Sequence, residues 1–251
     1  MITSLENEKI KNILKLQKKK YRDLTGTYLI EGRHMIEEAS KIGVVQEIFL
    51  QEEEEPFDDI PCTYVSLDIM KKISALTTPT TMVAVCKKRT FSDIKNEKKV
   101  LNKILLLDEV QDPGNLGTII RSSVAFGMDM ILLSENTVDL YNPKVLRATQ
   151  GMYCHIPIFS FNAKEAITYF KKNNYVIYGT NVLNGRDVKT LTSQEKEKFC
   201  LIMGNEGKGI KSDIQTLCDE NLYISMKQEV ESLNVGVACS ILLYELGDKN
   251  G

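Results

Sequence analysis

The chain has 251 residues, of which 43% are hydrophobic and 26% are charged, and its formal net charge is −2. This length allows one large domain or two smaller ones with cores of their own, and the charge excludes a globally basic protein. No apolar run reaches the roughly 18 residues of a membrane span and no signal peptide is recognisable, so we expect a cytoplasmic protein without a membrane partner.

The first predicted element is basic. Residues 9–22 contain apolar side chains at helical spacing and no acidic residue, which predicts one amphipathic helix with a basic face. Its basic residues are Lys9, Lys11, Lys15, Lys18, Lys19, Lys20 and Arg22. Two interpretations stay open: the face attracts RNA phosphates, or it is only a solvated helix surface. The acidic stretch 52–59 is interpreted as a solvated loop.

A small α/β unit follows the basic segment. A helix is predicted at 33–42, and apolar runs predict strands at 28–30, 47–50, 62–65 and 82–86. We expect this first domain to cover residues 1–88. The polar and charged stretch 89–103 is predicted to be a linker.

From residue 104 onward the strand and helix patterns alternate. Buried strands are predicted at 104–107, 130–133, 175–178, 199–203 and 222–225, and helices at 116–126, 163–172 and 235–246. Continuous apolar strands between helices are typical of a parallel sheet that is covered on both faces. We expect this α/β domain to cover residues 104–251.

Three short segments of this second domain carry the polar residues of a candidate site. They are 108–121 (DEVQDPGNLGTIIR), 201–209 (LIMGNEGKG) and 224–235, each at the end of a predicted buried strand. In a parallel α/β sheet ligands bind at the carboxyl edge of the strands. Three such segments in order therefore predict one assembled site.

Two common nucleotide-binding motifs do not match. The glycine-rich stretch 204–209 is too short for a phosphate-binding loop, and Gly209 stands where that loop needs Ser or Thr after its lysine. The dinucleotide fingerprint fails as well, because Ser212 stands in place of its third glycine. An ordinary ATPase or NAD enzyme is therefore disfavoured.

The three segments offer polar groups that could converge on a ligand. Candidates are the carboxylate of Glu206, the amides of Asn115 and Asn234, the hydroxyl of Ser232 and the guanidinium of Arg121, six residues beyond Asn115. Structural roles are the alternative: either asparagine could cap a helix, and Arg121 could form a surface ion pair.

Cysteine and histidine usage points to neither disulfides nor metal. The six cysteines are scattered without a Cys-x-x-Cys pair, which favours free, buried thiols in a reducing compartment. His34 and His155 lack metal-ligand spacing. We expect no structural zinc.

Taken together, the motifs resemble those of the SpoU (TrmH-type) RNA 2′-O-ribose methyltransferases of the SPOUT class. The resemblance rests on 112–117 (DPGNLG) with Arg121, on 203–207 (MGNEG) and on 232–235 (SLNV), with a weaker likeness at 142–148. It implies an α/β domain with a parallel sheet and a deep trefoil knot. The segments 26–32 and 78–85 resemble the ribosomal-protein-like α/β substrate-binding domain of rRNA-modifying members.

The resemblance also implies a cofactor and residue roles. S-adenosylmethionine would contact Gly204, Ile224 and Leu233, with Thr180, Met226 and Asn234 nearby. Arg121, Asn115, Glu206, Ser232 and Asn234 would form the catalytic site, without a metal. We expect Arg121 to orient the ribose hydroxyl or its phosphate, since a guanidinium stays protonated in proteins. Family members are typically homodimers.

The implied substrate is 23S rRNA, with tRNA as the second choice, because the shorter tRNA-modifying relatives lack the N-terminal domain. Candidate RNA contacts in that domain are Lys18, Lys19, Lys20, Arg22 and Arg33. A non-catalytic RNA-binding or ribosome-assembly factor of the same fold is the rival hypothesis. The intact candidate catalytic residues argue against it.

Overall fold

The chain forms two compact units in the computed structural model, which describes residues 1–90, 100–181, 185–227 and 229–247. The first unit holds residues 1–90 and 141–147, and the second holds the other described residues. Of the linker expected at 89–103, residues 91–99 lie outside the described residues, and a strand already begins at Lys103.

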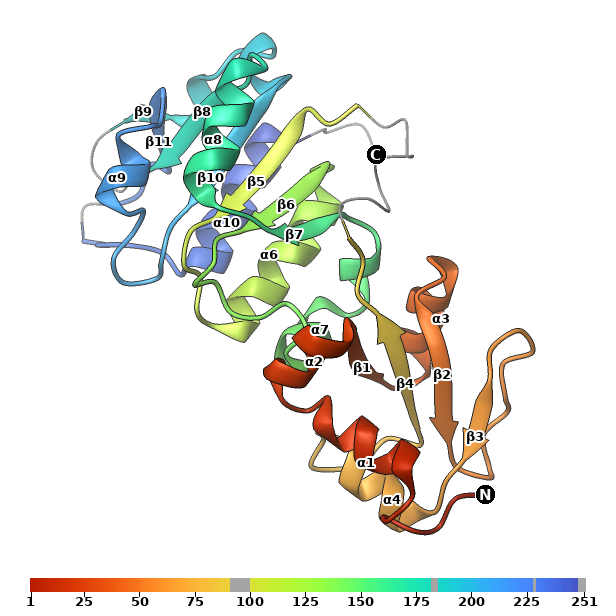
Figure 1. Ribbon diagram of the computed structural model, residues 1–251. Helices are drawn as coiled ribbons and strands as arrows, with labels where there is room; N and C mark the ends of the chain where they lie inside the picture. Colours follow the sequence, from red (N-terminus) through yellow and green to blue (C-terminus); the bar gives the residue numbers. More distant parts are fainter. Residues whose placement is uncertain (91–99, 182–184, 228, 248–251) are drawn as a thin grey trace. The chain divides into compact units, whose positions relative to one another are not determined.

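The first unit is a four-stranded sheet between helices (Figure 1). In sheet order its strands are β1 (Thr27–Glu31), β4 (Met82–Lys87), β2 (Val45–Leu50) and β3 (Cys62–Tyr64). Its helices are α1 (Glu8–Lys15), α2 (Lys19–Thr25), α3 (Arg33–Lys41) and α4 (Leu67–Ile73). Leu29, Phe49 and Val83 share a core with α1 and α4. Because side chains alternate along a strand, their buried neighbours face the opposite side, against α3.

The basic segment 9–22 is not one helix, so that prediction was wrong. α1 ends at Lys15, and α2 begins only at Lys19. The buried guanidinium of Arg22 donates from Nη1 to the carbonyl oxygens of Leu16 and Gln17, both at 2.9 Å. Carbonyl groups at a helix end need donors from outside the helix, and Arg22 supplies two, so the chain can turn there.

The second unit is built on a seven-stranded parallel sheet with the order β7-β6-β5-β10-β8-β11-β9 (Figure 1). The strands are β5 (Lys103–Leu107), β6 (Met130–Leu133), β7 (Ile158–Ser160), β8 (Val176–Thr180), β9 (Arg186–Asp187), β10 (Phe199–Met203) and β11 (Glu220–Tyr223). The predicted parallel α/β sheet is confirmed, although β7 and β9 were not foreseen. After β5, strands β6 and β7 extend the sheet on one side, and β8 to β11 all lie on the other side. The direction of winding therefore changes between the neighbours β5 and β10, which is the topological switch point of the sheet.

Helices cover both faces of this sheet. They are α6 (Pro113–Ala125), α8 (Ala163–Lys172), α9 (Ser212–Gln215) and α10 (Val235–Leu246), and short 3-10 turns lie at Met152–Cys154, Val188–Thr190 and Gln194–Lys196. One more helix, α7 (Pro143–Thr149), lies mostly in the stretch 141–147 that belongs to the first unit. α8 packs on one face through Ile167 and Phe170. α6 and α10 lie side by side on the other face, where the hydroxyls of Ser122 and Ser240 are 2.7 Å apart.

All six cysteines are free thiols. Among the described residues, no cluster of His, Cys, Asp or Glu could hold a metal ion. Within the same ranges, no helix is both long enough and apolar enough to cross a membrane.

Candidate active site

The three polar segments meet at the carboxyl edge of the second sheet. β5 and β10 are neighbours, so the segment that leads into α6 lies beside the loop 204–209 that follows β10. The third segment runs from the end of β11 to the start of α10, which packs on α6. The predicted meeting of these segments is therefore present in the fold.

Glu206 joins the first two segments. Its carboxylate accepts hydrogen bonds from the backbone N–H groups of Asp112 (3.0 Å) and Gln111 (3.2 Å) and from Nδ2 of Asn115 (3.2 Å). Partial burial acts to raise the pKa of this carboxyl, but the hydrogen bonds from Asp112, Asn115 and Gln111 outweigh it and lower the pKa below its ordinary value. Glu206 is therefore a carboxylate at neutral pH and holds the turn before α6 in place.

Asn115 extends the same network to the third segment. Its Oδ1 accepts a hydrogen bond from Nδ2 of Asn234 at 2.9 Å. The side chain of Asn234 also caps α10, because its Oδ1 accepts from the N–H groups of Gly236 (2.9 Å) and Val237 (3.2 Å). Glu206, Asn115 and Asn234, one from each segment, thus form a continuous chain of hydrogen bonds.

Of the two possible helix-capping roles, only the one for Asn234 is present. The cap of α6 is Asp112, whose Oδ1 accepts from the N–H of Asn115 at 2.8 Å, with Pro113 at the first helical position. The sequence carries this signal, since an Asp followed by Pro is typical of a helix start. The side chain of Asn115 is therefore available for Glu206 and Asn234.

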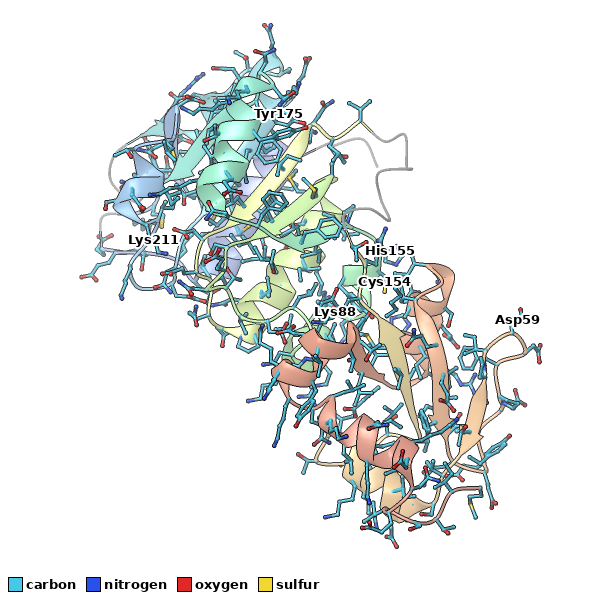
Figure 2. The ribbon with its side chains drawn as sticks, in the orientation of Figure 1. Asp59, Lys88, Cys154, His155, Tyr175 and Lys211 are labelled. Carbon is cyan, nitrogen blue, oxygen red and sulfur yellow. The ribbon has the colours of Figure 1, made fainter. Side chains whose placement is uncertain are left out.

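The turn after β5 is held from both sides. Glu109 has a φ of 60°, an unusual conformation for a residue with a side chain. Its carbonyl accepts from Nδ2 of Asn205 at 2.9 Å, and its carboxylate pairs with Nζ of Lys211 at 2.7 Å (Lys211 is labelled in Figure 2). Nδ2 of Asn136 donates to the same carboxylate oxygen at 2.6 Å. The first motif is thus tied to the loops that follow β6 and β10, and the sequence analysis did not foresee this tie.

A cavity of about 240 Å³ lies at the ends of β8, β10 and β11. Five of the six residues predicted to contact the cofactor line it, namely Thr180, Gly204, Ile224, Met226 and Leu233. The sixth, Asn234, stands between the lining residues Leu233 and Val235. Two candidate catalytic residues, Glu206 and Ser232, also line it.

The walls of this cavity are largely apolar. Beyond the predicted residues, they include Met203, Leu222, Tyr223, Ala238 and Leu242. These residues were not among the predicted cofactor contacts. For Ala238 and Leu242 a signal was present, because α10 is apolar on more than one face, as expected of a helix that packs on two sides. Gly204 is required here, because a Cβ at this position would lie 2.2 Å from the backbone of Gly209 and Ile210.

Arg121 lies outside the cavity. It is exposed on α6 and lines a separate hollow of about 470 Å³, together with Thr118, Phe126, Gln150 and Met152 among others. Among the described residues it forms no ion pair, and no hydrogen bond links it to Glu206 or Asn234. The structure thus brings four of the five candidate catalytic residues to the cavity or its rim and leaves Arg121 further along α6.

The predicted RNA contacts divide into two groups. Lys18, Lys19 and Lys20 are exposed, as a surface role requires. Arg22 is buried and bonds backbone carbonyls, so its guanidinium is directed into the protein, contrary to expectation. Arg33 is also engaged, because its Nη2 donates to Glu54 Oε2 and to a backbone carbonyl, both at 3.0 Å.

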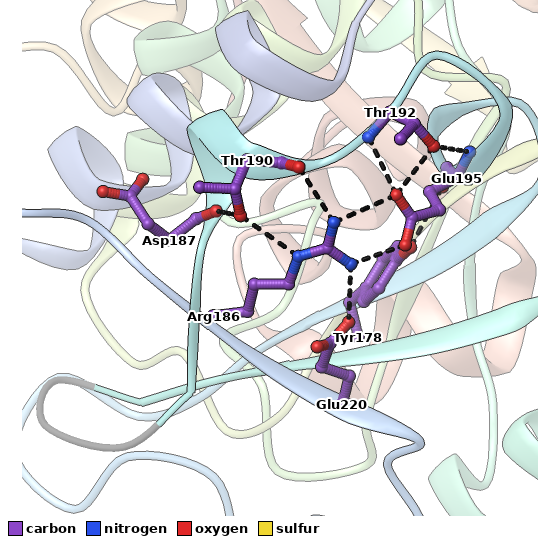
Figure 3. Close-up of polar contacts among 7 residues, drawn as sticks. All are labelled: Tyr178, Arg186, Asp187, Thr190, Thr192, Glu195 and Glu220. Atoms are coloured by element: carbon purple, nitrogen blue, oxygen red, sulfur yellow. Dashed lines mark hydrogen bonds and ion pairs between the residues drawn. The ribbon is translucent and has the colours of Figure 1, made fainter.

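An ion-pair cluster fastens the edge of the sheet beside the cavity (Figure 3). Nη1 and Nη2 of Arg186 on β9 bond the carboxylate of Glu195 at 2.5 and 3.2 Å, and Glu220 on β11 lies 3.7 Å from Nη1. The hydroxyl of Tyr178 on β8 donates to the carbonyl of Glu195 at 3.0 Å. The segment 186–195 is thereby attached to two strands that end at the cavity.

Comparison with known proteins identifies the family of this site. Residues 102–244 match the model of the SpoU rRNA methylase family, and residues 7–84 match that of the MRM3-like substrate-binding domain. The first match covers all three polar segments. The chain belongs to the SpoU rRNA methylase family.

Individual members of the family are similar over nearly the whole chain. The 23S rRNA (guanosine(2553)-2′-O)-methyltransferase RlmP of Bacillus subtilis (strain 168) is 39% identical over 251 residues, which cover 98% of each chain. An S-adenosylmethionine-bound rRNA methyltransferase from Sinorhizobium meliloti has a TM-score of 0.86 at 27% identity, over 98% of this chain and 96% of that one. A candidate RNA methyltransferase of the TrmH family from Porphyromonas gingivalis has a TM-score of 0.83 at 28% identity, over 97% of this chain and 98% of that one.

These likenesses agree with the resemblance seen in the motifs. The chain is an RNA 2′-O-ribose methyltransferase that uses S-adenosylmethionine, as its SpoU family membership and its relatives indicate. The expectation of an enzyme with this cofactor is therefore confirmed.

Proposed function

We propose that this enzyme methylates the ribose 2′-OH of a guanosine in 23S rRNA that corresponds to position 2553. The observation that carries the proposal is the 39% identity with RlmP over 98% of both chains, which includes the substrate-binding domain as well as the catalytic motifs. tRNA is the second substrate to test. We place the enzyme in the cytoplasm, where ribosomal RNA is modified.

The cavity between β8, β10 and β11 fits the proposed cofactor. Its apolar walls suit an adenine ring, and the missing side chain at Gly204 lets the loop 204–209 fold closely on itself at the cavity wall. The bound cofactor supplies a methyl group already activated on a positively charged sulfur. Glu206, ionised beside the same cavity, provides a complementary negative charge.

The protein's own task is then to position the ribose hydroxyl. Alignment of a nucleophile with its target can remove on the order of 7–11 kcal/mol from a barrier, so geometry carries much of the catalysis. The network of Glu206, Asn115 and Asn234 keeps the three loops in register. We assign Ser232, on the cavity wall, to polar contact with the ligands and Arg121 to orientation of the hydroxyl or its phosphate.

We also propose that the enzyme is a homodimer through the second unit. Val237, Ile241 and Tyr244 form one stripe of α10, and Val237 and Tyr244 are 48% and 52% exposed. The stripe adjoins α6, which carries Arg121 on an exposed surface. A partner covering this area would bury the stripe and bring protein groups to Arg121. Light scattering should give about twice the monomer mass of 28.4 kDa; a monomer at assay concentrations would refute the dimer.

The role of Arg121 is tested by Arg121→Ala. Because Arg121 lines no part of the cavity, we expect the affinity for S-adenosylmethionine, measured by calorimetric titration, to stay within about twofold of wild type. Methyl transfer to a 23S rRNA transcript should fall by about 100-fold or more, as is typical when a positioning or proton-handling group is lost.

The matched control is Arg147→Ala, which removes another exposed arginine from helix α7. It should retain transfer within a few-fold of wild type. Loss of cofactor binding in Arg121→Ala, or full transfer activity in that variant, would show that the role assigned to Arg121 is wrong.

A further inference from the structure

A group of lysines on the first unit forms a surface that the catalytic site does not use. These lysines come from the end of α1, the start of α2 and the last turn of α4, three elements that are separate in sequence. We call the group the lysine surface. Its members are Lys15, Lys18, Lys19, Lys20, Lys71 and Lys72, and all six are exposed.

Hydrogen bonds hold the three elements together. Nε2 of Gln17, in the turn between α1 and α2, donates to the carbonyl oxygen of Lys72 at 2.9 Å. The same turn is held from inside by Arg22, which bonds the carbonyls of Leu16 and Gln17. Because the turn is attached both to the core and to the end of α4, the chain segments that carry these lysines are held close to one another.

The lysine surface is short of acidic partners. Asp23 lies between Nζ of Lys19 (2.6 Å) and Nζ of Lys88 (2.7 Å), so more than one positive charge faces it. Asp68 is 3.8 Å from Lys71, a weak contact at an exposed position.

The other members of the lysine surface lack such contacts. In the described part of the chain, no carboxylate lies within ion-pair distance of Lys18, Lys20 or Lys72. The surface thus concentrates six positive charges in a protein whose overall charge is −2.

We propose that the lysine surface binds the phosphate backbone of the substrate RNA. This inference rests on the proposed function, since an rRNA methyltransferase must hold a large polyanion while one nucleotide reacts. Flexible ammonium groups on several helix ends suit phosphates at variable positions, and each contact releases counterions from the RNA. Arg22 then acts through the turn that it builds, and does not itself touch RNA.

The test compares two double variants of the full-length protein with equal changes of charge. Lys20→Gln with Lys72→Gln removes two lysines that have no ion pair. Lys9→Gln with Lys41→Gln removes two exposed lysines of the same unit that are already paired, with Glu47 and Glu38 at 2.7 and 2.6 Å. Affinity for a labelled 23S rRNA transcript is measured at several salt concentrations, and thermal melting verifies folding.

We expect the Lys20/Lys72 variant to bind the transcript roughly tenfold more weakly, with a salt slope reduced by about 1 to 2, since each phosphate contact contributes about 0.7–0.9. The KM for RNA should rise in the same proportion, while the Lys9/Lys41 control stays close to wild type. An unchanged slope, or an equal loss in both variants, would refute the lysine surface. Absence of methyl transfer by the wild-type protein would instead refute the proposed function.

Discussion

At the residue scale, Glu206 is the group on which the site depends. It accepts hydrogen bonds from Gln111, Asp112 and Asn115, all in the first segment, although it belongs to the second. The sequence reasoning expected Glu206 to contact a ligand directly. Its position on the cavity wall permits that contact, but its hydrogen bonds also show a structural task, namely to hold the turn before α6.

Residue types alone could not reveal such double roles. Asn234 was open to two interpretations, cap or site residue, and the structure gives it a cap together with a bond to Asn115. Arg22 looked like any other cation in a basic segment. Only the packing of α1 against α2 shows that carbonyl oxygens at a helix end draw its guanidinium inward.

Gly204 gives a sharp test of the cavity at this scale. A Cβ at this position would meet the backbone of Gly209 and Ile210 at 2.2 Å, which the loop can relieve only by moving. We therefore expect Gly204→Ala to weaken S-adenosylmethionine binding by roughly tenfold or more, measured by calorimetry.

Gly207→Ala is the matched control in the same loop. Its added Cβ would come no closer than 3.9 Å to Oδ1 of Asn205, so no backbone shift is needed. Gly207 lines the same cavity, so wild-type affinity in both variants would mean that the loop does not form the cofactor's binding surface, and an equal loss in both would mean that the backbone clash at Gly204 is not the cause.

At the element scale, the sequence pattern was most informative for long, buried elements. The bounds of β6, β10, α8 and α10 coincide with the predicted ranges, because continuous apolar runs and helical periodicity extend over their full length. β7 and β9 have only three and two residues and lie at the two edges of the sheet. Such short edge strands carry too few side chains to show a period.

Ion pairs and hydrogen bonds of Arg186 attach the two-residue edge strand β9 to its neighbours. Hydrogen bonds from Arg186, then from Thr192, lower the pKa of Glu195 from 4.5 to about 2. Burial, together with the nearby carboxylates of Glu195 and Glu220, raises the pKa of Tyr178 to about 12, so its hydroxyl stays protonated as a donor. The cluster therefore needs an ionised Glu195 beside a protonated Tyr178.

This arrangement predicts a pH-dependent stability difference between wild type and Glu195→Gln. The folded-state pKa of Glu195 is depressed, so its contribution is fully present above about pH 4.5 and is lost as the pH falls toward about 2. Melting temperatures measured from pH 7 downward should differ by a constant amount above pH 5. The difference should shrink below pH 4.5.

The comparison needs a control for acid effects elsewhere in the chain. Glu197→Gln, at an exposed position near the cluster, should show no such trend. A wild-type advantage that persisted undiminished at pH 3 would contradict the assignment of the ion pair.

At the scale of the whole molecule, the order of three motifs predicted one site, and the sheet explains why. The three segments are spread over residues 108–235, but they follow β5, β10 and β11, whose carboxyl ends lie at one edge of the sheet. Sequence reasoning could not give the fit between segments, such as the bond from Asn234 to Asn115. The trefoil knot stays a prediction from the family resemblance, because strand order alone does not say whether a chain passes through its own loop.

Whole-chain features also bear on the choice of substrate. Residues 102–244 match the SpoU rRNA methylase model, and residues 7–84 match the MRM3-like substrate-binding model. We therefore look for the groups that select the RNA in the first unit. The candidate RNA contacts of the first unit changed most between sequence and structure, since Arg22 and Arg33 have protein partners. Surface charge is visible in a sequence, but its pairing is visible only in the fold.

The most direct test of the central claim is to map ribose methylation on 23S rRNA after incubation with the purified enzyme and S-adenosylmethionine. Unmethylated rRNA is digested, and the fragments are analysed by mass spectrometry. We predict one added methyl group, on the 2′ oxygen of the guanosine equivalent to position 2553. Methylation of a base, methylation at another nucleotide, or no methylation beside an active family member run in parallel would contradict the account.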